Sequence, residues 1–283
     1  MFIQWYPGHM TKAMRMMQDA IKQVDCVIYV LDCRAIASCL NPKFDDMIKD
    51  KPTLYILGKS DLVESGDVKQ WTAYFAAQGK NFVVADNLSG RQRNFIVDKL
   101  KQINRQMLEK YAAKGANVSI RAMVVGVPNT GKSTLINSLC VSKRTLTGNR
   151  PGVTRGKQWV SLAEGIELLD TPGVVPPAFE DQQRALHLAF IGSIKEEILH
   201  LDDLAIEIIK YCREKNYERF CERYKLDKID DDNVQVFDDI AKNRGYLLGK
   251  KGYDYDRTAK AIVYDFKSGK LGKIMLDFPS DLV

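Results

Sequence analysis

The sequence contains no run that approaches twenty consecutive apolar residues, so it predicts no helix that crosses a membrane. The first ten residues also lack the basic start and apolar run of a signal peptide, and the Arg- and Ser-rich composition of a transit peptide. We therefore expect neither kind of targeting segment, and a cytoplasmic location.

The six cysteines include no C-x-x-C pair. A zinc site made from Cys26, Cys33 and Cys39 is one alternative, but no histidine or second close cysteine pair accompanies them. The pattern favours reduced structural thiols, as in cytosolic proteins.

The sequence contains enough apolar residues for a folded core, and its charged residues are unevenly distributed. Of 283 residues, 45% are hydrophobic and 28% are charged, which is typical of a globular protein. Residues 1–179 carry 24 basic and 15 acidic residues, and residues 240–275 carry 9 and 3, with an acidic segment between these regions. A polyanionic partner and a merely well-solvated surface account for this pattern about equally well.

Strand and helix patterns alternate in the first part of the chain and predict an α/β sheet with helices on both faces. Helices are expected at 11–23, 67–78 and 92–113, and strands at 24–31, 53–57, 82–85, 121–126, 159–162 and 166–169. After the Pro-Pro pair at 176–177, residues 181–278 are mostly helical, with breaks expected at 201–203, 230–232 and 249–252. We therefore expect two domains, 1–178 and a small all-α domain at 179–283.

A phosphate-binding loop is the strongest motif. Residues 126–134 read G-V-P-N-T-G-K-S-T, which matches G-x-x-x-x-G-K-[ST] between an expected strand and an expected helix. Backbone N–H groups and the helix N-terminus would surround the phosphates of a nucleotide. Lys132 would reach the β- and γ-phosphates, and the Ser133 hydroxyl would bind Mg²⁺.

Two further segments complete the phosphate and metal side of the site. Residues 168–173 read L-L-D-T-P-G, so Asp170 fits the acidic residue behind Mg²⁺ and the N–H of Gly173 fits the γ-phosphate. Between the two motifs, Thr154 offers a second hydroxyl ligand for the metal. This order of motifs indicates a GTPase of the translation-factor class.

The guanine-reading motif lies on the wrong side of the phosphate loop. Residues 58–61 read G-K-S-D, in which Asp61 can accept two hydrogen bonds from guanine and the Lys59 stem can lie over the base. This stretch lies about seventy residues before the phosphate loop, and nothing after residue 173 replaces it. The sequence therefore predicts a circularly permuted domain, since permutation is tolerated where chain ends lie close together at the surface.

In this order the motifs resemble those of the circularly permuted ribosome-biogenesis GTPase A family of bacteria. The resemblance covers essentially the whole chain and also includes I-Q-W-Y-P-G-H-M at 3–10, D-C-R at 32–34, N-P at 41–42 and R-P-G-V-T at 150–154. It implies a GTPase that binds ribosomal RNA and acts late in assembly of the large ribosomal subunit. It also implies that the C-terminal helical domain binds RNA.

The chain departs from the family pattern at two base-side positions. Gly58 stands where the family usually has Asn, which would tie the base loop to the phosphate loop, so its loss is expected to loosen nucleotide binding. Asn87 stands where the family often has Ser, and the resemblance implies a base contact there. The residues predicted to bind the nucleotide are Lys59, Ser60, Asp61, Asn87, Asn129, Thr130, Gly131, Lys132, Ser133, Thr134 and Gly173.

The residue that orients the attacking water is not the usual one. Many GTPases have Gln just after D-x-x-G, but Val174 occupies that position. The permuted topology and the resemblance make His9 the catalytic candidate, against the alternative of an N-terminal clasp in which His9 is structural. Resemblance to related GTPases also implies that Asn129 helps to hold K⁺, against the alternative of a turn-forming Asn after Pro128.

Three functions remain open at this point. The first is a GTPase switch that works on ribosomal RNA, with GTP or GDP, Mg²⁺ and the large subunit as ligands and partner, and with neither membrane nor DNA expected. The second is a general phosphate-loop ATPase, because Gly58 weakens the guanine motif. The third is an RNA-binding scaffold with a vestigial nucleotide site, which the intact phosphate and metal residues disfavour.

Overall fold

The computed structural model describes residues 2–4, 8–86, 90–140, 158–162, 165–175, 179, 181–249 and 252–282. Within these ranges, no helix is long and apolar enough to span a membrane.

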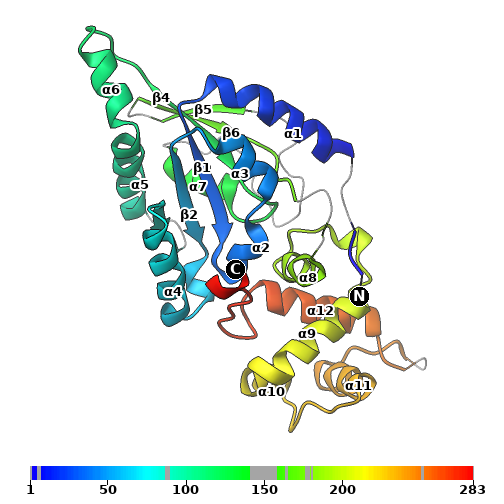
Figure 1. Ribbon diagram of the computed structural model, residues 1–283. Helices are drawn as coiled ribbons and strands as arrows, with labels where there is room; N and C mark the ends of the chain where they lie inside the picture. Colours follow the sequence, from blue (N-terminus) through cyan, green and yellow to red (C-terminus); the bar gives the residue numbers. More distant parts are fainter. Residues whose placement is uncertain are drawn as a thin grey trace.

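One six-stranded sheet organises the first part of the chain (Figure 1), with the strand order β3-β2-β1-β4-β6-β5. All neighbouring strands are parallel except β5 and β6, which are antiparallel. The strands are β1 Cys26–Asp32, β2 Thr53–Gly58, β3 Asn81–Val84, β4 Ile120–Val125, β5 Gln158–Leu162 and β6 Ile166–Asp170. This confirms the expected α/β fold.

The strand order places the base-side and phosphate-side segments along one edge of the sheet. Asp32 at the end of β1 pairs with Gly58 at the end of β2, and Val124 near the end of β4 pairs with Asp170 at the end of β6. Because the carboxyl ends of parallel strands share one edge, the segments that follow these strands meet there. The central pair, β1 and β4, joins the two halves although about ninety residues separate them along the chain.

Helices cover both faces of the sheet because side chains alternate along each buried strand. In β1, Ile28 and Val30 face a cluster that contains α5 and α7, whereas Val27, Tyr29 and Leu31 face a larger cluster that contains α1 and α4. The helices of this part are α1 Gly8–Ala20, α2 Ile36–Cys39, α3 Pro42–Ile48, α4 Ser65–Ala77, α5 Gly90–Ile103, α6 Arg105–Ala112 and α7 Lys132–Leu139.

The rest of the chain is helical and lies below the sheet in Figure 1. Its helices are α8 Gln182–Phe190, α9 Leu201–Lys215, α10 Tyr217–Tyr224, α11 Asn233–Arg244 and α12 Tyr255–Lys267. Phe190 packs on Phe266 with ring centroids 5.0 Å apart, and both belong to the same apolar cluster as α1 and α4. The two parts thus share one core, and the domain division at 178 stays a prediction.

The observed elements differ from the expected ones in three places. The expected helix at 92–113 is interrupted at Asn104, whose side-chain Nδ2 donates to the Leu100 carbonyl, giving α5 and α6. The expected break at 201–203 is wrong: these residues form the first turn of α9, where Asp202 and Asp203 favour the positive end of the helix dipole. The short helices α2 and α3 were missed, although Asn41-Pro42 is a helix-start signal and the Asn41 side chain caps α3.

Candidate functional site

The phosphate loop follows β4 and leads directly into α7. Gly126 has φ of +150°, and a Cβ there would lie 2.4 Å from the Val30 carbonyl oxygen, so no other residue fits. Gly131 has φ of +99° and precedes Lys132, the first residue of α7. The strand, turn and helix context that the motif requires is therefore present.

Lys132 is buried in this loop and its ammonium is held by backbone oxygens. Its Nζ donates to the carbonyls of Gly126 at 3.0 Å and Val127 at 2.7 Å. Burial lowers the pKa of Lys132 to about 8, although the nearby Asp170 charge opposes this effect. The group is therefore placed where an anion that enters the loop would stabilise its charged form.

The D-T-P-G segment lies against the phosphate loop. Asp170 is 1% exposed at the end of β6, and Thr171 Oγ1 donates to the Val124 carbonyl at 2.6 Å. At Gly173 a Cβ would lie 2.6 Å from the Pro128 nitrogen and 2.9 Å from Lys132 Nζ, so a side chain is excluded. A carboxylate such as that of Asp170 and a hydroxyl such as that of Ser133 are oxygen donors of the kind that Mg²⁺ prefers, and their role as metal ligands stays a prediction. Thr154, the third predicted metal ligand, lies outside the described residues.

Five residues of the predicted nucleotide-binding set line one cavity of about 270 Å³, namely Lys59, Asp61, Thr130, Gly131 and Thr134; the predicted residues Asn129, Lys132, Ser133 and Gly173 do not line it. Its lining residues are Val30, Ile56, Gly58, Lys59, Asp61, Leu62, Ala85, Asp86, Thr130, Gly131, Thr134 and Leu135. Ser60 does not line this cavity, and its backbone N–H donates to the Ala85 carbonyl. Asn87 lies outside the described residues. The fold therefore brings the two motifs together despite their separation in sequence.

Lys59 connects the base side to the phosphate side directly. It adopts the left-handed conformation, with φ of 59°. Its Nζ donates to Asp32 Oδ2 at 2.7 Å and to the Asn129 carbonyl at 2.6 Å. Asp32 is fully buried. It belongs to the D-C-R motif, but no local sequence signal predicted its contact with Lys59.

Position 58 does not require glycine. Its φ is not positive, and a Cβ there would lie 3.4 Å from the Leu31 carbonyl oxygen and 3.6 Å from that of Thr130, which are ordinary contacts. A longer side chain at this position would therefore start beside the phosphate loop. The Lys59 bond to Asn129 already supplies one tie between the two loops.

The phosphate loop also contacts the helical part. Asn129 has φ of 60°, and its side-chain Nδ2 donates to the Gly192 carbonyl at 2.6 Å. Ser193, fully buried, donates from Oγ to the Pro128 carbonyl at 2.7 Å. No local sequence signal marks Gly192 or Ser193, because both follow α8 and reach the loop only through the tertiary fold.

His9 and Val174 lie in contrasting surroundings. His9 is exposed in the first turn of α1, and its pKa is lowered by partial desolvation and by the positive charge of Lys195. Val174 is fully buried in the apolar core, so it does not face a water beside the phosphates. The catalytic role of His9 stays a prediction.

The cysteines considered for zinc are separate buried thiols. Cys26, Cys33 and Cys39 are free and buried, and burial raises the pKa of Cys26 to about 12. Across the described part of the chain, no group of three His, Cys, Asp or Glu side chains is placed to hold a metal ion.

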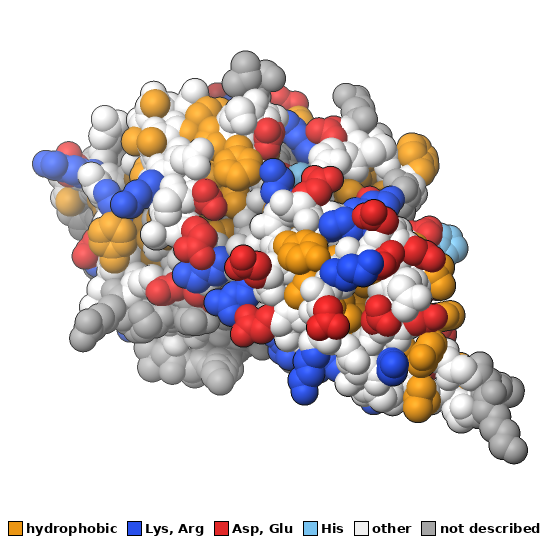
Figure 2. All heavy atoms as spheres, turned by 90° about the horizontal axis from the view of Figure 1, so that it is seen from below, with side chains coloured by type: hydrophobic (Ala, Val, Ile, Leu, Met, Phe, Trp, Pro, Cys, Tyr) orange, Lys and Arg blue, Asp and Glu red, His pale blue; other side chains and the backbone are white. Residues whose placement is uncertain are grey.

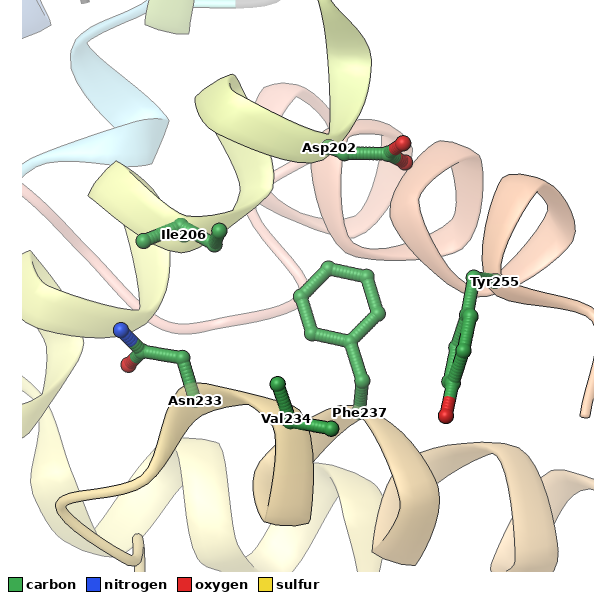
Figure 3. A pocket seen from close by; sticks show the side chains of 6 residues that line it. All are labelled: Asp202, Ile206, Asn233, Val234, Phe237 and Tyr255. Atoms are coloured by element: carbon green, nitrogen blue, oxygen red, sulfur yellow. The ribbon is translucent and has the colours of Figure 1, made fainter.

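A second hollow, of about 180 Å³, lies in the helical part and contains none of the predicted nucleotide residues. Figure 3 shows Phe237 and Val234 on α11, Ile206 and Asp202 on α9, and Tyr255 at the start of α12. The Tyr255 hydroxyl donates to Asp238, which adds a carboxylate beside the hollow.

The phosphate loop shares a cavity with Lys59 and Asp61, which are predicted to read the base and lie earlier in the chain. This arrangement defines a circularly permuted P-loop GTPase. Comparison with known proteins agrees. The model of the family described as "50S ribosome-binding GTPase" matches residues 121–237, which begin at the phosphate-loop strand and leave Lys59 and Asp61 outside the match.

Relatives match over the full length. Ribosome biogenesis GTPase A of Bacillus cereus is 42% identical over 99% of this chain and 95% of its own. That of Thermotoga maritima is 31% identical over 99% and 96%. The crystal structure of GNP-bound YlqF from T. maritima superposes with a TM-score of 0.66 at 26% identity, covering 95% of this chain and 98% of that one. The chain belongs to the ribosome biogenesis GTPase A family and is a GTPase.

Proposed function

We propose that this GTPase binds ribosomal RNA during late assembly of the large ribosomal subunit, and that hydrolysis of GTP to GDP and phosphate triggers its release. The observation that carries the nucleotide part is the cavity shared by Lys59, Asp61 and Thr130. The names of the relatives and of the matching family support a ribosomal partner. A cytoplasmic location follows from that partner.

The nucleotide would lie across the carboxyl edge of the sheet. Asp61 accepts hydrogen bonds from guanine, the Lys59 stem covers the base, and Lys132 binds the β- and γ-phosphates. Ser133 and Asp170 would hold Mg²⁺, together with Thr154. The ion would supply positive charge beside the phosphate oxygens.

His9 would orient or deprotonate the attacking water. The pKa of His9 is lowered, so its imidazole is largely neutral near pH 7 and one ring nitrogen can accept a proton. Val174 is buried and leaves the usual glutamine position without a polar group. His9→Ala should therefore slow ribosome-stimulated hydrolysis at least about tenfold while leaving GTP affinity near normal. Unchanged single-turnover rates with ribosomal subunits would show that His9 is only structural.

Asn129 would help to hold K⁺ beside the nucleotide. The supporting observation is its place in the phosphate loop and its fixed amide, whose nitrogen donates to Gly192. The turn-forming alternative also has support, because Asn129 occupies the left-handed region that Asn tolerates better than most residues. Turnover measured in KCl and in NaCl at equal ionic strength separates the two.

Basic residues beyond α11 would contact the RNA. Arg257 and Lys260 line a surface hollow of about 620 Å³ together with Tyr253 and Leu248. Arg257 also lies over the Tyr246 ring, 4.4 Å from its centroid. Tyr246 and Tyr253 are half-buried, and basic groups beside accessible ring faces are a combination that binds phosphates and stacks on unpaired bases.

Sedimentation with purified ribosomal subunits tests this function. The protein should pellet with the large subunit in the presence of a non-hydrolysable GTP analogue and dissociate with GDP. Pelleting with neither subunit, or equally with both nucleotides, would contradict the proposal. The ATPase alternative, which Gly58 motivates, is tested by a separate titration in which GTP and ATP compete for the nucleotide site.

A further inference from the structure

The fully buried carboxylate of Asp32 is hydrogen-bonded to Lys59, the lysine predicted to cover the guanine base. Asp32 Oδ2 accepts from Lys59 Nζ at 2.7 Å and from Arg34 Nη2 at 2.8 Å. Asp32 Oδ1 accepts from Arg34 Nε at 3.0 Å and from the Arg34 backbone N–H at 3.1 Å. Burial opposes the charged form, but the Arg34 and Lys59 charges outweigh it and hold the pKa of Asp32 well below its usual range.

Lys59 depends on this carboxylate for its conformation. A free lysine side chain samples many rotamers, and ordering it costs conformational entropy. Here two hydrogen bonds fix the ammonium, and the stem is left as part of the wall of the base cavity. A stem held in place before the base arrives loses less entropy on binding than a mobile one.

Arg34 in turn fixes the carboxylate. It is 2% exposed and uses both sides of its guanidinium fork on Asp32. Its remaining terminal nitrogen, Nη1, donates to the Lys267 carbonyl at the end of α12 at 2.9 Å, and its own carbonyl accepts from the Leu276 N–H at 2.7 Å. Arg34 is therefore held from the helical part while it holds Asp32 on the base side.

We propose that Asp32 and Arg34 are positioning residues for guanine recognition. Asp32 holds the Lys59 ammonium and Arg34 holds Asp32, and neither touches the nucleotide. This role belongs to the GTPase site itself and does not depend on the proposed ribosomal partner. The competing account is a buried ion pair that only stabilises the fold. The two accounts differ in whether the effect of replacing Arg34 on GDP affinity requires the Lys59 side chain.

A double-mutant cycle on the full chain separates them. Arg34→Ala should weaken GDP binding roughly tenfold, while binding of inorganic pyrophosphate, which has no base, changes by less than about twofold. In a Lys59→Met background, Arg34→Ala should cost less than about twofold in GDP affinity, because the group that it positions is gone. Equal losses in both backgrounds, or equal losses for GDP and pyrophosphate, would overturn the proposal.

A matched control lies in the helical part. Arg223 makes a similar two-bond pair with the buried Asp265, at 2.7 and 3.0 Å, away from the base cavity. Arg223→Ala should lower the unfolding midpoint without changing GDP affinity. If Arg34→Ala does not fold, Arg34→Lys serves instead, because it keeps the charge but cannot form the two-bond fork. An Arg34→Lys protein with unchanged GDP affinity would then overturn the proposal.

Discussion

Position 58 shows how a single missing side chain is partly replaced by another contact. The family pattern expects an asparagine that ties the base loop to the phosphate loop, and Gly58 has no such group. The Lys59 ammonium reaches the Asn129 carbonyl and provides a tie of its own. The site therefore lacks one connection and keeps another.

Gly58→Asn should tighten GDP binding at least about twofold, because one or two hydrogen bonds worth roughly 0.5–1.5 kcal/mol each would be restored. The space exists, since a Cβ at this position meets only ordinary contacts. Equilibrium titration with a fluorescent GDP analogue measures the change. Gly58→Ala is the control; equal tightening there would attribute the gain to a stiffer backbone and not to the amide.

Lys132 should make nucleotide binding depend on pH. Its pKa is about 8 in the free protein, and bound phosphates favour the charged form and raise that pKa. Binding therefore takes up about half a proton at pH 8 and much less at pH 7, and affinity is lost as pH rises above 8. Calorimetry of GDP binding in two buffers with different ionisation enthalpies measures this uptake. Lys132→Arg, which does not titrate, should show none.

At the scale of elements, the C-terminal segment after α12, residues 268–282, contacts α2, α4 and α8 through Asp277. Asp277 is 2% exposed and its carboxylate accepts from the Ser38 backbone N–H in α2, from Ser38 Oγ and from His187 in α8. Its carbonyl accepts from Trp71 Nε1 in α4 at 3.0 Å. One residue therefore fixes the C-terminal segment to both parts of the molecule.

Asp277→Ala should lower the free energy of unfolding by about 2–5 kcal/mol, because it leaves several buried donors without an acceptor. Urea titration followed by tryptophan fluorescence reports the change, since Trp71 lies beside the site. Asp281→Ala, at an exposed position in the same segment, should cost less than about 1 kcal/mol. A similar loss in both variants would mean that the whole segment, and not Asp277, is responsible.

The sequence predicted the elements that carry local signals. The phosphate loop, the D-T-P-G turn and the displaced G-K-S-D are each recognised from adjacent residues. The contacts of Asn129 with Gly192 and of Asp277 with His187 could not be predicted, because each joins segments about sixty or more residues apart without a motif. The break at Asn104 was missed because the apolar spacing continues across it, while its side chain competes for a helix carbonyl.

At the scale of the whole molecule, acidic and basic side chains are intermixed on the face of the helical part that Figure 2 shows, around exposed apolar ones. Among the described residues, the hollow of Figure 3 is bordered by Asp202 and by no basic residue. The neighbouring hollow is lined by Arg257 and Lys260 together with Asp254 and Asp256, and Tyr255 lines both hollows. We expect RNA phosphates to contact Arg257 and Lys260.

Replacing both Arg257 and Lys260 by Ala should weaken binding to the large subunit and reduce the slope of log affinity against log salt by about 1.4–1.8, for two lost phosphate contacts. Sedimentation across a series of KCl concentrations measures the slope, and GDP affinity should not change. Lys114→Ala, exposed after α6, is the control. An unchanged slope would place the RNA surface elsewhere, for example on Lys250 and Lys251, which lie outside the described residues.

The C-terminal segment also has a consequence for how the protein is made. Ile274 and Leu276 donate their N–H groups to the carbonyls of Leu62 and Arg34, so the wall of the cavity at Leu62 is held by a segment more than two hundred residues later in the chain. Chains emerge from the ribosome N-terminus first, and segments far apart in sequence pair only after the later one is free. A nascent chain in which residues 274–276 have not yet left the ribosome therefore lacks these two hydrogen bonds at the cavity. We expect the cavity to reach its final form only after this late segment has docked.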